Sequence, residues 1–232
     1  MNSWDLFYKS FVTKGGYKVV LDGLLTTVEI AVIGLLIGIA IGTLLAVAKV
    51  IPKYRFFPKI LSAIADCYVG LFRGTPMVVQ LLVGYFVLLP ALKIRADATV
   101  VAIVIFGMNS GAYVCEIMRS GINSVDKGQL EAGRALGLSY PKAMFTIVIP
   151  QAVKNILPTL GNEFISLIKE TSVVSFIAVV DLTKAFRQIG DANYEYVIPY
   201  LMLAAVYLVL VLIITALVKF LERRMGKSDR RN

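Results

Sequence analysis

Five runs of apolar residues, each long enough to cross a lipid bilayer, limit what this sequence of 232 residues can fold into. A membrane-spanning helix needs about 20 mostly apolar residues, because each residue adds about 1.5 Å across a hydrocarbon core about 30 Å thick. Hydrophobic residues make up 58% of the chain and charged residues 17%, whereas soluble domains average about 45–50% and about 25%. The sequence therefore predicts an all-α integral membrane protein with five transmembrane helices. The runs lie at about 24–48, 60–89, 99–120, 151–180 and 197–218.

Lysine and arginine are unevenly divided between the two sides of such a five-span bundle. Thirteen of those outside the spans fall on the side of the loops 49–59 and 121–149 and the C-terminal tail, and seven fall on the other side. By the positive-inside rule, the richer side is cytoplasmic and the N-terminus lies outside. We therefore expect one domain over 1–232, with an extracytoplasmic interfacial segment at 1–23, a five-span core at 24–218, a cytoplasmic loop at 121–149 and a basic cytoplasmic tail at 219–232.

Two runs carry signs of how their helices are built. The second run is interrupted by Arg73-Gly74-Thr75-Pro76. As one straight helix it would cover about 45 Å, more than the hydrocarbon core, so a broken span is expected, with Pro76 in the first turn of its second half. In the first run, Gly34, Gly38 and Gly42 are spaced four apart, which lets another helix approach closely.

Several kinds of site are disfavoured by composition. Histidine is absent, which excludes Ser-His-Asp and Cys-His catalysis and any histidine-bound metal. Cys67 and Cys115 lack CxxC spacing and are expected to be packing residues rather than metal ligands. Gly226-Lys227-Ser228 ends like a phosphate-binding loop, but Leu221 stands where such a loop begins with glycine. We expect no metal and no cofactor on this chain.

The polar interruption between the third and fourth runs, EAGRALGLSYPKAMFTIVIP at 131–150, resembles the EAA loop of ABC importer permeases. That pattern is EAA, three residues, Gly, nine residues and I-x-L-P; Gly133 replaces the third Ala and Ile149 the Leu. The resemblance implies a cytoplasmic coupling helix seated in a cleft of an ATPase subunit. Gly137 is expected to end this helix in the left-handed conformation. The residues implied in coupling are Glu131, Ala132, Gly133, Arg134, Ala135 and Gly137.

Three further segments resemble the permease subunits of polar amino acid ABC importers, the histidine/glutamine/arginine-type family. They are FRGTP at 72–76 followed by Gln80, YVCEIMRSGI at 113–122, and NEFISLIKETS at 162–172. The resemblance implies alternating access in a homodimer, or a heterodimer with a similar permease. It also implies two separate ATPase subunits that hold ATP and Mg, and an extracytoplasmic solute-binding protein that delivers the amino acid. The chain itself would then not be an enzyme.

Charged residues inside the runs are the candidate substrate path, because each costs at least about 2.5–3.5 kcal/mol at a helix centre unless it is paired or faces water. In the fourth run, Asn162, Ser166 and Lys169 share one helical face, and Glu163, Ser166 and Glu170 a neighbouring one. Carboxylates would receive the substrate ammonium, and Arg73 with the helix start near Pro76 would attract its carboxylate. The candidate path comprises Arg73, Gln80, Asn109, Glu116, Glu163, Ser166, Lys169 and Glu170.

Three alternatives stand beside this reading. The charges in the spans, four of each sign, could form purely structural ion pairs: Asp66, Glu116, Glu163 and Glu170 against Arg73, Arg119, Lys154 and Lys169. A secondary transporter driven by an ion gradient would also carry buried carboxylates, but it would not need the EAA-like spacing. An intramembrane enzyme would need a Ser-Lys or Asp-Asp arrangement, for which only Ser166 and Lys169 offer a match.

Overall fold

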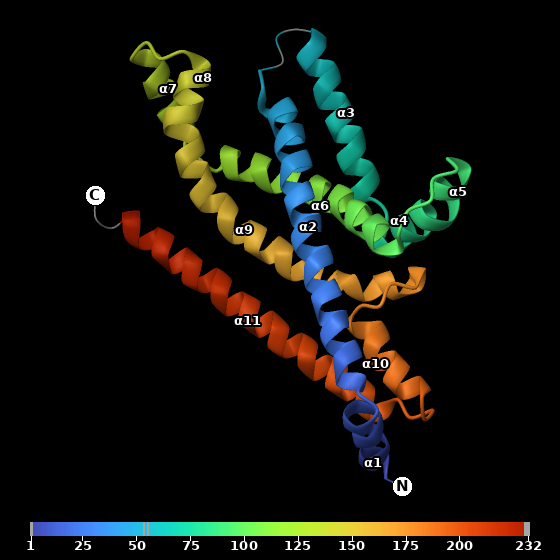
Figure 1. Ribbon diagram of the computed structural model, residues 1–232. Coiled ribbons are helices and arrows are strands. Elements are labelled where there is room, and N and C mark those ends of the chain that lie inside the picture. Colours follow the sequence, from blue (N-terminus) through green and yellow to red (C-terminus); the bar gives the residue numbers. More distant parts are fainter. Residues whose placement is uncertain (1, 53, 55, 230–232) are drawn as a thin grey trace.

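The computed structural model describes residues 2–52, 54 and 56–229, with side chains as far as residue 223. Within this part, every regular element is helical. The longest helices are α2 (Gly16–Val50), α6 (Ala98–Asn123), α9 (Ile149–Glu170) and α11 (Val197–Asp229). Figure 1 shows the short helix α7 (Lys127–Ala135) at one end of the bundle and the N-terminus at the opposite end.

Four helical stretches are long and apolar enough to cross a membrane on their own, namely Gly16–Val50, Ala98–Asn123, Tyr140–Ile177 and Val197–Arg223. A fifth crossing exists if α3 (Phe56–Arg73) and the stretch Met77–Ala91 form one span bent by 100°. The structure therefore has the helical break that the sequence predicts at Arg73–Pro76. Pro76 sits at the N-cap of α4 (Met77–Val83), one position before the first turn. A π-helical turn, η2 (Gly84–Leu88), and α5 (Leu89–Ala91) complete the stretch.

The closest helix pair is α2 with α6, and the glycines of the first run make this approach possible. A Cβ added at Gly38 would lie 2.7 Å from the Cβ of Ser110, and one at Gly42 would lie 2.6 Å from the Cβ of Val114. The packing is reciprocal, because a Cβ at Gly107 on α6 would lie 2.5 Å from Cγ2 of Ile37 on α2. The predicted close approach of a second helix is therefore confirmed.

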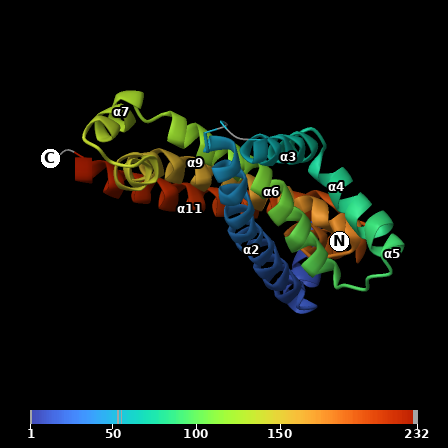
Figure 2. The ribbon, with the colours of Figure 1, turned by 90° about the horizontal axis from the view of Figure 1, so that it is seen from above.

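The helices α9 and α11 lie on one side of this pair. The span Tyr140–Ile177 consists of α8 (Tyr140–Ala143), a π-helical turn η3 (Met144–Val148), α9 and the 3-10 turn η4 (Thr171–Ile177). In Figures 1 and 2, α11 runs beside α9, and α3 lies on the other side of α6. Most of α11 is exposed, as expected for a helix that faces lipid.

The segment between the last two predicted spans contains a helix that was not predicted from the sequence. Residues 181–196 lie outside the predicted spans and are rich in polar side chains, but they contain the amphipathic helix α10 (Leu182–Asp191). Its apolar face packs against Phe7, in α1 (Ser3–Tyr8), and against Val20 of α2. The apolar positions of α10, three or four residues apart, were the missed signal: Leu182, Ala185, Phe186 and Ile189.

The two ends of the chain are more regular than the outline suggests. After α1 comes a π-helical turn, η1 (Lys9–Thr13), and α2 begins at Gly16 behind the left-handed Gly15. The first two turns of α2 thus belong to the segment 1–23 that was expected to lie on the membrane surface. At the other end, α11 continues through the described part of the tail to Asp229.

Candidate functional site

A row of polar side chains on α6 organises the predicted site residues. Asn109, Tyr113 and Glu116 are spaced by four and three residues, so they share one face of the helix. Each has a partner in, or linked to, the broken span that begins with α3. We call these three residues the α6 stripe. The polar stripe on α9 was predicted from the sequence, whereas the α6 stripe was not.

Asn109, the first residue of the α6 stripe, helps to fix the break between α3 and α4 through Gln80. The Gln80 amide nitrogen donates to the carbonyl oxygens of Phe72, at 2.8 Å, and Thr75, at 3.0 Å. Asn109 donates to the Gln80 side-chain oxygen at 2.9 Å. Since a broken helix leaves carbonyl groups without helical partners, these amide groups satisfy them. The structure thus brings Gln80 and Asn109 together at the break.

Arg73 ends α3 and lies on the same side of α6. Its guanidinium carbon is 5.2 Å from the ring centroid of Tyr113, a cation–π distance. The Arg73 side chain is nevertheless exposed, as is the break that follows it. This arrangement holds the cation in place while its hydrogen-bond donors stay available to an anion.

The predicted acidic residues of α9 are placed differently from one another. Glu163 is partly buried, and the hydroxyl of Ser110 on α6 donates to its Oε1 at 3.0 Å. Ser166 is also partly buried, whereas Asn162, Lys169 and Glu170 are exposed. The polar face of α9 therefore begins against α6 at Glu163 and emerges at the end of the helix at Glu170.

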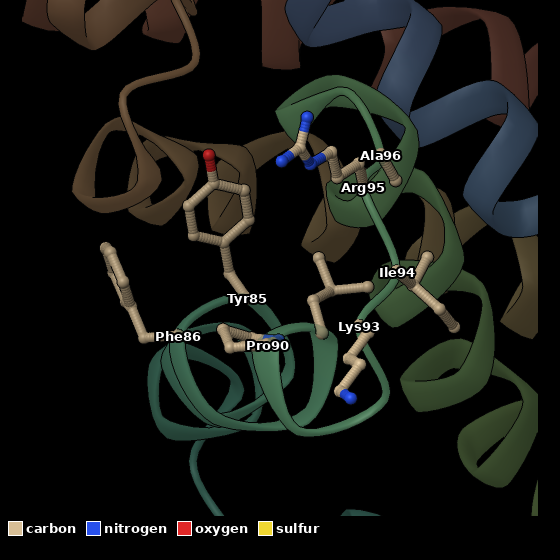
Figure 3. A pocket seen from close by; sticks show the side chains of 8 residues that line it. Tyr85, Phe86, Pro90, Lys93, Ile94, Arg95 and Ala96 are labelled. Carbon is tan, nitrogen blue, oxygen red and sulfur yellow. The ribbon is translucent and has the colours of Figure 1, made fainter.

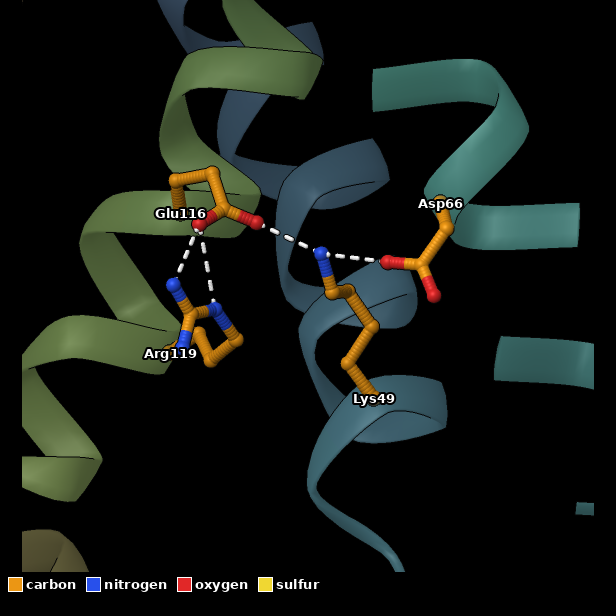
Figure 4. Close-up of polar contacts among 4 residues, drawn as sticks. All are labelled: Lys49, Asp66, Glu116 and Arg119. Atoms are coloured by element: carbon orange, nitrogen blue, oxygen red, sulfur yellow. Dashed lines mark hydrogen bonds and ion pairs between the residues drawn. The ribbon is translucent and has the colours of Figure 1, made fainter. Parts of the chain in front are cut away.

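Glu116 lies in a cluster of four charged residues that we call the Lys49 cluster: Lys49, Asp66, Glu116 and Arg119 (Figure 4). The Lys49 ammonium is 2.6 Å from Oε1 of Glu116 and 2.8 Å from Oδ1 of Asp66. Arg119 donates twice to the other oxygen of Glu116, at 2.6 and 3.0 Å. Lys49 was assigned to a loop on sequence, but it lies in the last turn of α2. The cluster joins α2, α3 and α6.

The predicted coupling residues lie on and just after α7. Glu131, Ala132, Arg134 and Ala135 are exposed, and Gly133 is buried. A Cβ at Gly133 would lie 2.7 Å from Cδ1 of Ile147, so α7 packs closely against this side chain at the third position of the motif. The exposed residues form one free surface, which we call the α7 surface.

Gly137 ends α7 in the manner predicted. Its φ is +84°, in the left-handed region. The amide of Leu138 donates to the carbonyl of Gly133 at 3.2 Å, and the amide of Gly137 donates to that of Arg134 at 3.0 Å. These two bonds form the Schellman pattern that closes a helix. Arg134 adds a side-chain bond to the carbonyl of Leu138 at 2.9 Å.

Several cavities lie away from the stripes, and two of them border the predicted coupling segment and the broken span. One of 560 Å³ lies beside α7 and is lined by residues that include Lys127, Glu131 and Tyr140. The other, of 690 Å³, lies at the end of the broken span and contains none of the predicted site residues. In Figure 3, the Arg95 guanidinium and the Tyr85 hydroxyl lie on the same side of this cavity, whereas Lys93 points in the opposite direction.

A buried carboxylate, Asp181, was not anticipated from the sequence. Its side chain is fully buried and caps α10 by accepting from the amides of Thr183 and Lys184, each at 2.9 Å. Burial raises the pKa of Asp181, and these backbone hydrogen bonds partly oppose the rise. The spacing of an aspartate directly before the apolar positions of α10 is the helix-start signal that could have revealed it.

Comparison with known proteins gives consistent results over almost the whole chain. The profile of the family described as binding-protein-dependent transport system inner membrane component matches residues 21–227. The arginine transport system permease protein ArtQ of Bacillus subtilis is 42% identical over 210 residues, covering 90% of this chain and 94% of that protein. The glutamine transport system permease protein GlnP of Escherichia coli is 36% identical over 206 residues, covering 88% and 92%.

Solved structures agree with this result. The crystal structure of an amino acid ABC transporter with histidines has a chain that is 38% identical and superposes with a TM-score of 0.84, covering 92% of this chain and 98% of that one. An inward-facing structure of the MetNI methionine ABC transporter superposes with a TM-score of 0.74 at 17% identity, covering 89% and 96%. At that identity the second likeness shows the fold alone.

Proposed function

This chain belongs to the family of binding-protein-dependent transport system inner membrane components, and from that membership we infer that it is the permease subunit of an ABC importer for a polar amino acid. The observation that carries the inference is a match over nearly the whole chain to amino acid permeases, including those for arginine and glutamine. It is a transport subunit and not an enzyme, since ATP is hydrolysed by a separate subunit. A secondary transporter driven by an ion gradient is not favoured.

The importer requires partners that lie outside this chain. We propose a pair of ATPase subunits that hold ATP and Mg, a second permease copy or a similar permease, and an extracytoplasmic solute-binding protein. The excess of basic residues in the segments next to α7 and the C-terminus supports an orientation with both in the cytoplasm and the N-terminus outside. Closure of the ATPases would tilt the paired bundles between inward-facing and outward-facing states.

The α7 surface is the proposed docking site for the ATPase. Its support is geometric: Gly133 packs against the chain, whereas Glu131, Ala132, Arg134 and Ala135 are exposed and can be reached by a partner. Gly137 fixes where the helix ends and therefore how this surface is presented. A displacement of α7 would be transmitted to α6 and α9, because residues 124–126 connect α7 to α6 and residues 136–139 connect it to α8, which leads into α9.

The proposed substrate path runs between α6, α9 and the break of α3. Its acidic side is formed by Glu163 and Glu170, which would receive the substrate ammonium, with Ser166 beside them. Its cationic side is Arg73, whose side chain is exposed beside Tyr113 and would attract the substrate carboxylate. Gln80 and Asn109 shape the path through their hydrogen bonds at the break between α3 and α4. Glu116 contributes indirectly, through its ion pair with Lys49.

The first experiment is to reconstitute the chain with its ATPase and binding protein and to add single polar amino acids in turn. We expect one of them to stimulate ATP hydrolysis and to be taken up. A folded chain that binds no ATPase would overturn the importer assignment.

Glu163→Gln then tests the path. Its loss of charge should reduce substrate-stimulated ATP hydrolysis while assembly with the ATPase stays intact. Glu222→Gln, on α11 away from both stripes, is the matched control. If stimulation in Glu163→Gln equals that of the control, Glu163 belongs to a structural network and not to the path.

A further inference from the structure

Lys49 joins two helices that the proposed transport cycle must move together. Its ammonium lies between the carboxylates of Asp66 on α3 and Glu116 on α6, and its side chain is only 12% exposed (Figure 4). With Arg119 on the far oxygen of Glu116, the cluster has two positive and two negative groups. The Lys49–Glu116 pair is mostly buried, with Glu116 19% exposed, whereas Asp66 on α3 is 56% exposed. A buried ion pair adds little net stability compared with apolar packing. The cluster therefore fixes positions more than it stabilises the fold.

The helix α3 depends on such contacts because its apolar packing is sparse. Of its 18 residues, only Ser62, Ala65 and Val69 are buried. Besides the Lys49 contact, the Tyr68 hydroxyl holds α3 to α6 by donating to the carbonyl of Met108 at 2.7 Å. A helix with few buried side chains that is followed by a 100° break can move as a unit.

The two carboxylates lie on helices that lead to different parts of the molecule. Glu116 lies about three helical turns before α7, whose surface is the proposed ATPase docking site. Asp66 lies about two turns before Arg73, at the break that borders the proposed substrate path. Lys49 is thus the ionic link between the helix leading to the ATPase and the helix leading to the substrate.

We propose that Lys49 is a positioning residue that transmits movement of α6 to α3, and so couples ATP hydrolysis to the opening at the Arg73 break. The inference rests on the proposed importer function. A displacement of α7 shifts the end of α6, Glu116 carries Lys49 with it, and Lys49 draws Asp66 and α3 along. Without the Lys49–Asp66 contact, α3 would still be held to α6 by the Tyr68 hydrogen bond and by the contacts at the break, but it would follow α6 less closely.

The test uses the full complex in liposomes, with uptake and ATP hydrolysis measured together. Asp66→Leu removes the α3 end of the link, and Asp66→Asn weakens it with less disturbance. We expect both variants to assemble and hydrolyse ATP, while the amino acid taken up per ATP falls about fivefold or more in Asp66→Leu, the low end of typical coupling free energies. Lys49→Arg keeps a positive charge between the two carboxylates and should keep the normal ratio. Asp22→Leu, an exposed carboxylate near the other end of α2, is the control.

A second readout follows α3 itself. Cys67 is exposed beside Asp66, whereas Cys115 is buried, so an environment-sensitive fluorophore can be attached to Cys67 selectively. Its emission should change on adding ATP to the wild-type complex, and this change should be smaller in Asp66→Leu. An unchanged uptake ratio, an equal loss of uptake and hydrolysis, or a fluorescence change that is as large in Asp66→Leu as in the wild type would each overturn the relay. A wild-type complex without ATP-dependent uptake would instead overturn the importer function.

Discussion

Replacing Gly42 by alanine tests whether the close packing of α2 against α6, which leaves no room for a Cβ at this position, stabilises the bundle. The added Cβ would lie 2.6 Å from the Cβ of Val114 and 2.8 Å from the backbone nitrogen of Cys115. Non-bonded carbon atoms rest at about 3.5–4.0 Å, so the helices would have to separate by roughly 1 Å at this point. Part of the obstruction is backbone, which cannot turn aside as a flexible side chain could.

The expected loss follows from overpacking. Forcing extra atoms into a packed interface costs about 1–3 kcal/mol. Glycine to alanine in a helix also gains up to about 1 kcal/mol from helix propensity, which must be subtracted. Gly70→Ala provides that correction, because Gly70 is a helical residue of α3 where an added Cβ meets nothing within 4 Å. The difference between the two variants isolates the overpacking.

The assay is thermal unfolding in detergent micelles. For a chain of this size, each kcal/mol corresponds to about 2–4 °C, so Tm of Gly42→Ala should lie about 2–12 °C below that of Gly70→Ala. Adding Val114→Ala to Gly42→Ala should recover part of the loss, since residues in contact are not additive. Equal Tm values for Gly42→Ala and Gly70→Ala would refute the argument that α2 and α6 need glycine at their contact.

Two further variants test the ends of short helices. Asp181→Ala removes the cap of α10 and should cost about 0.5–2 kcal/mol, seen as a lower Tm, whereas Asp181→Asn keeps a capping group. Because the native pKa of Asp181 is raised above its ordinary value of 3.8, its ionised form costs native stability above that native pKa. The Tm of the wild type relative to Asp181→Asn should therefore rise as pH falls through the native pKa towards 3.8; a constant difference would contradict this. Gly137→Val forces a branched side chain into the left-handed region at about 1–2 kcal/mol and should lower uptake per ATP, while Leu136→Ala, at an exposed neighbour, should not. Normal transport by Gly137→Val would argue against α7 as the coupling helix.

The features that the sequence determined by itself are those set by local spacing. Hydropathy defined the long helices, because burying backbone groups in lipid requires continuous helix. The Arg73–Pro76 break, the α2 glycines and the helix end at Gly137 were also readable, because each depends on residues within one or two turns. The amphipathic helix α10 is also readable from local spacing, because its apolar residues recur every three or four positions among the polar ones.

The pairings between helices were decided only by the tertiary structure. Lys49 and Glu116 are 67 residues apart, and Ser110 and Glu163 are 53 apart. Local periodicity can place a charge on a face, but it does not say which other helix that face meets. On sequence, Glu116 and Glu163 were both candidates for the substrate path, whereas the crossing of α2 and α6 adds Lys49 to the local partner of Glu116, Arg119. Long-range packing decides this, because a charge within the bundle takes the partner that the fold places within reach.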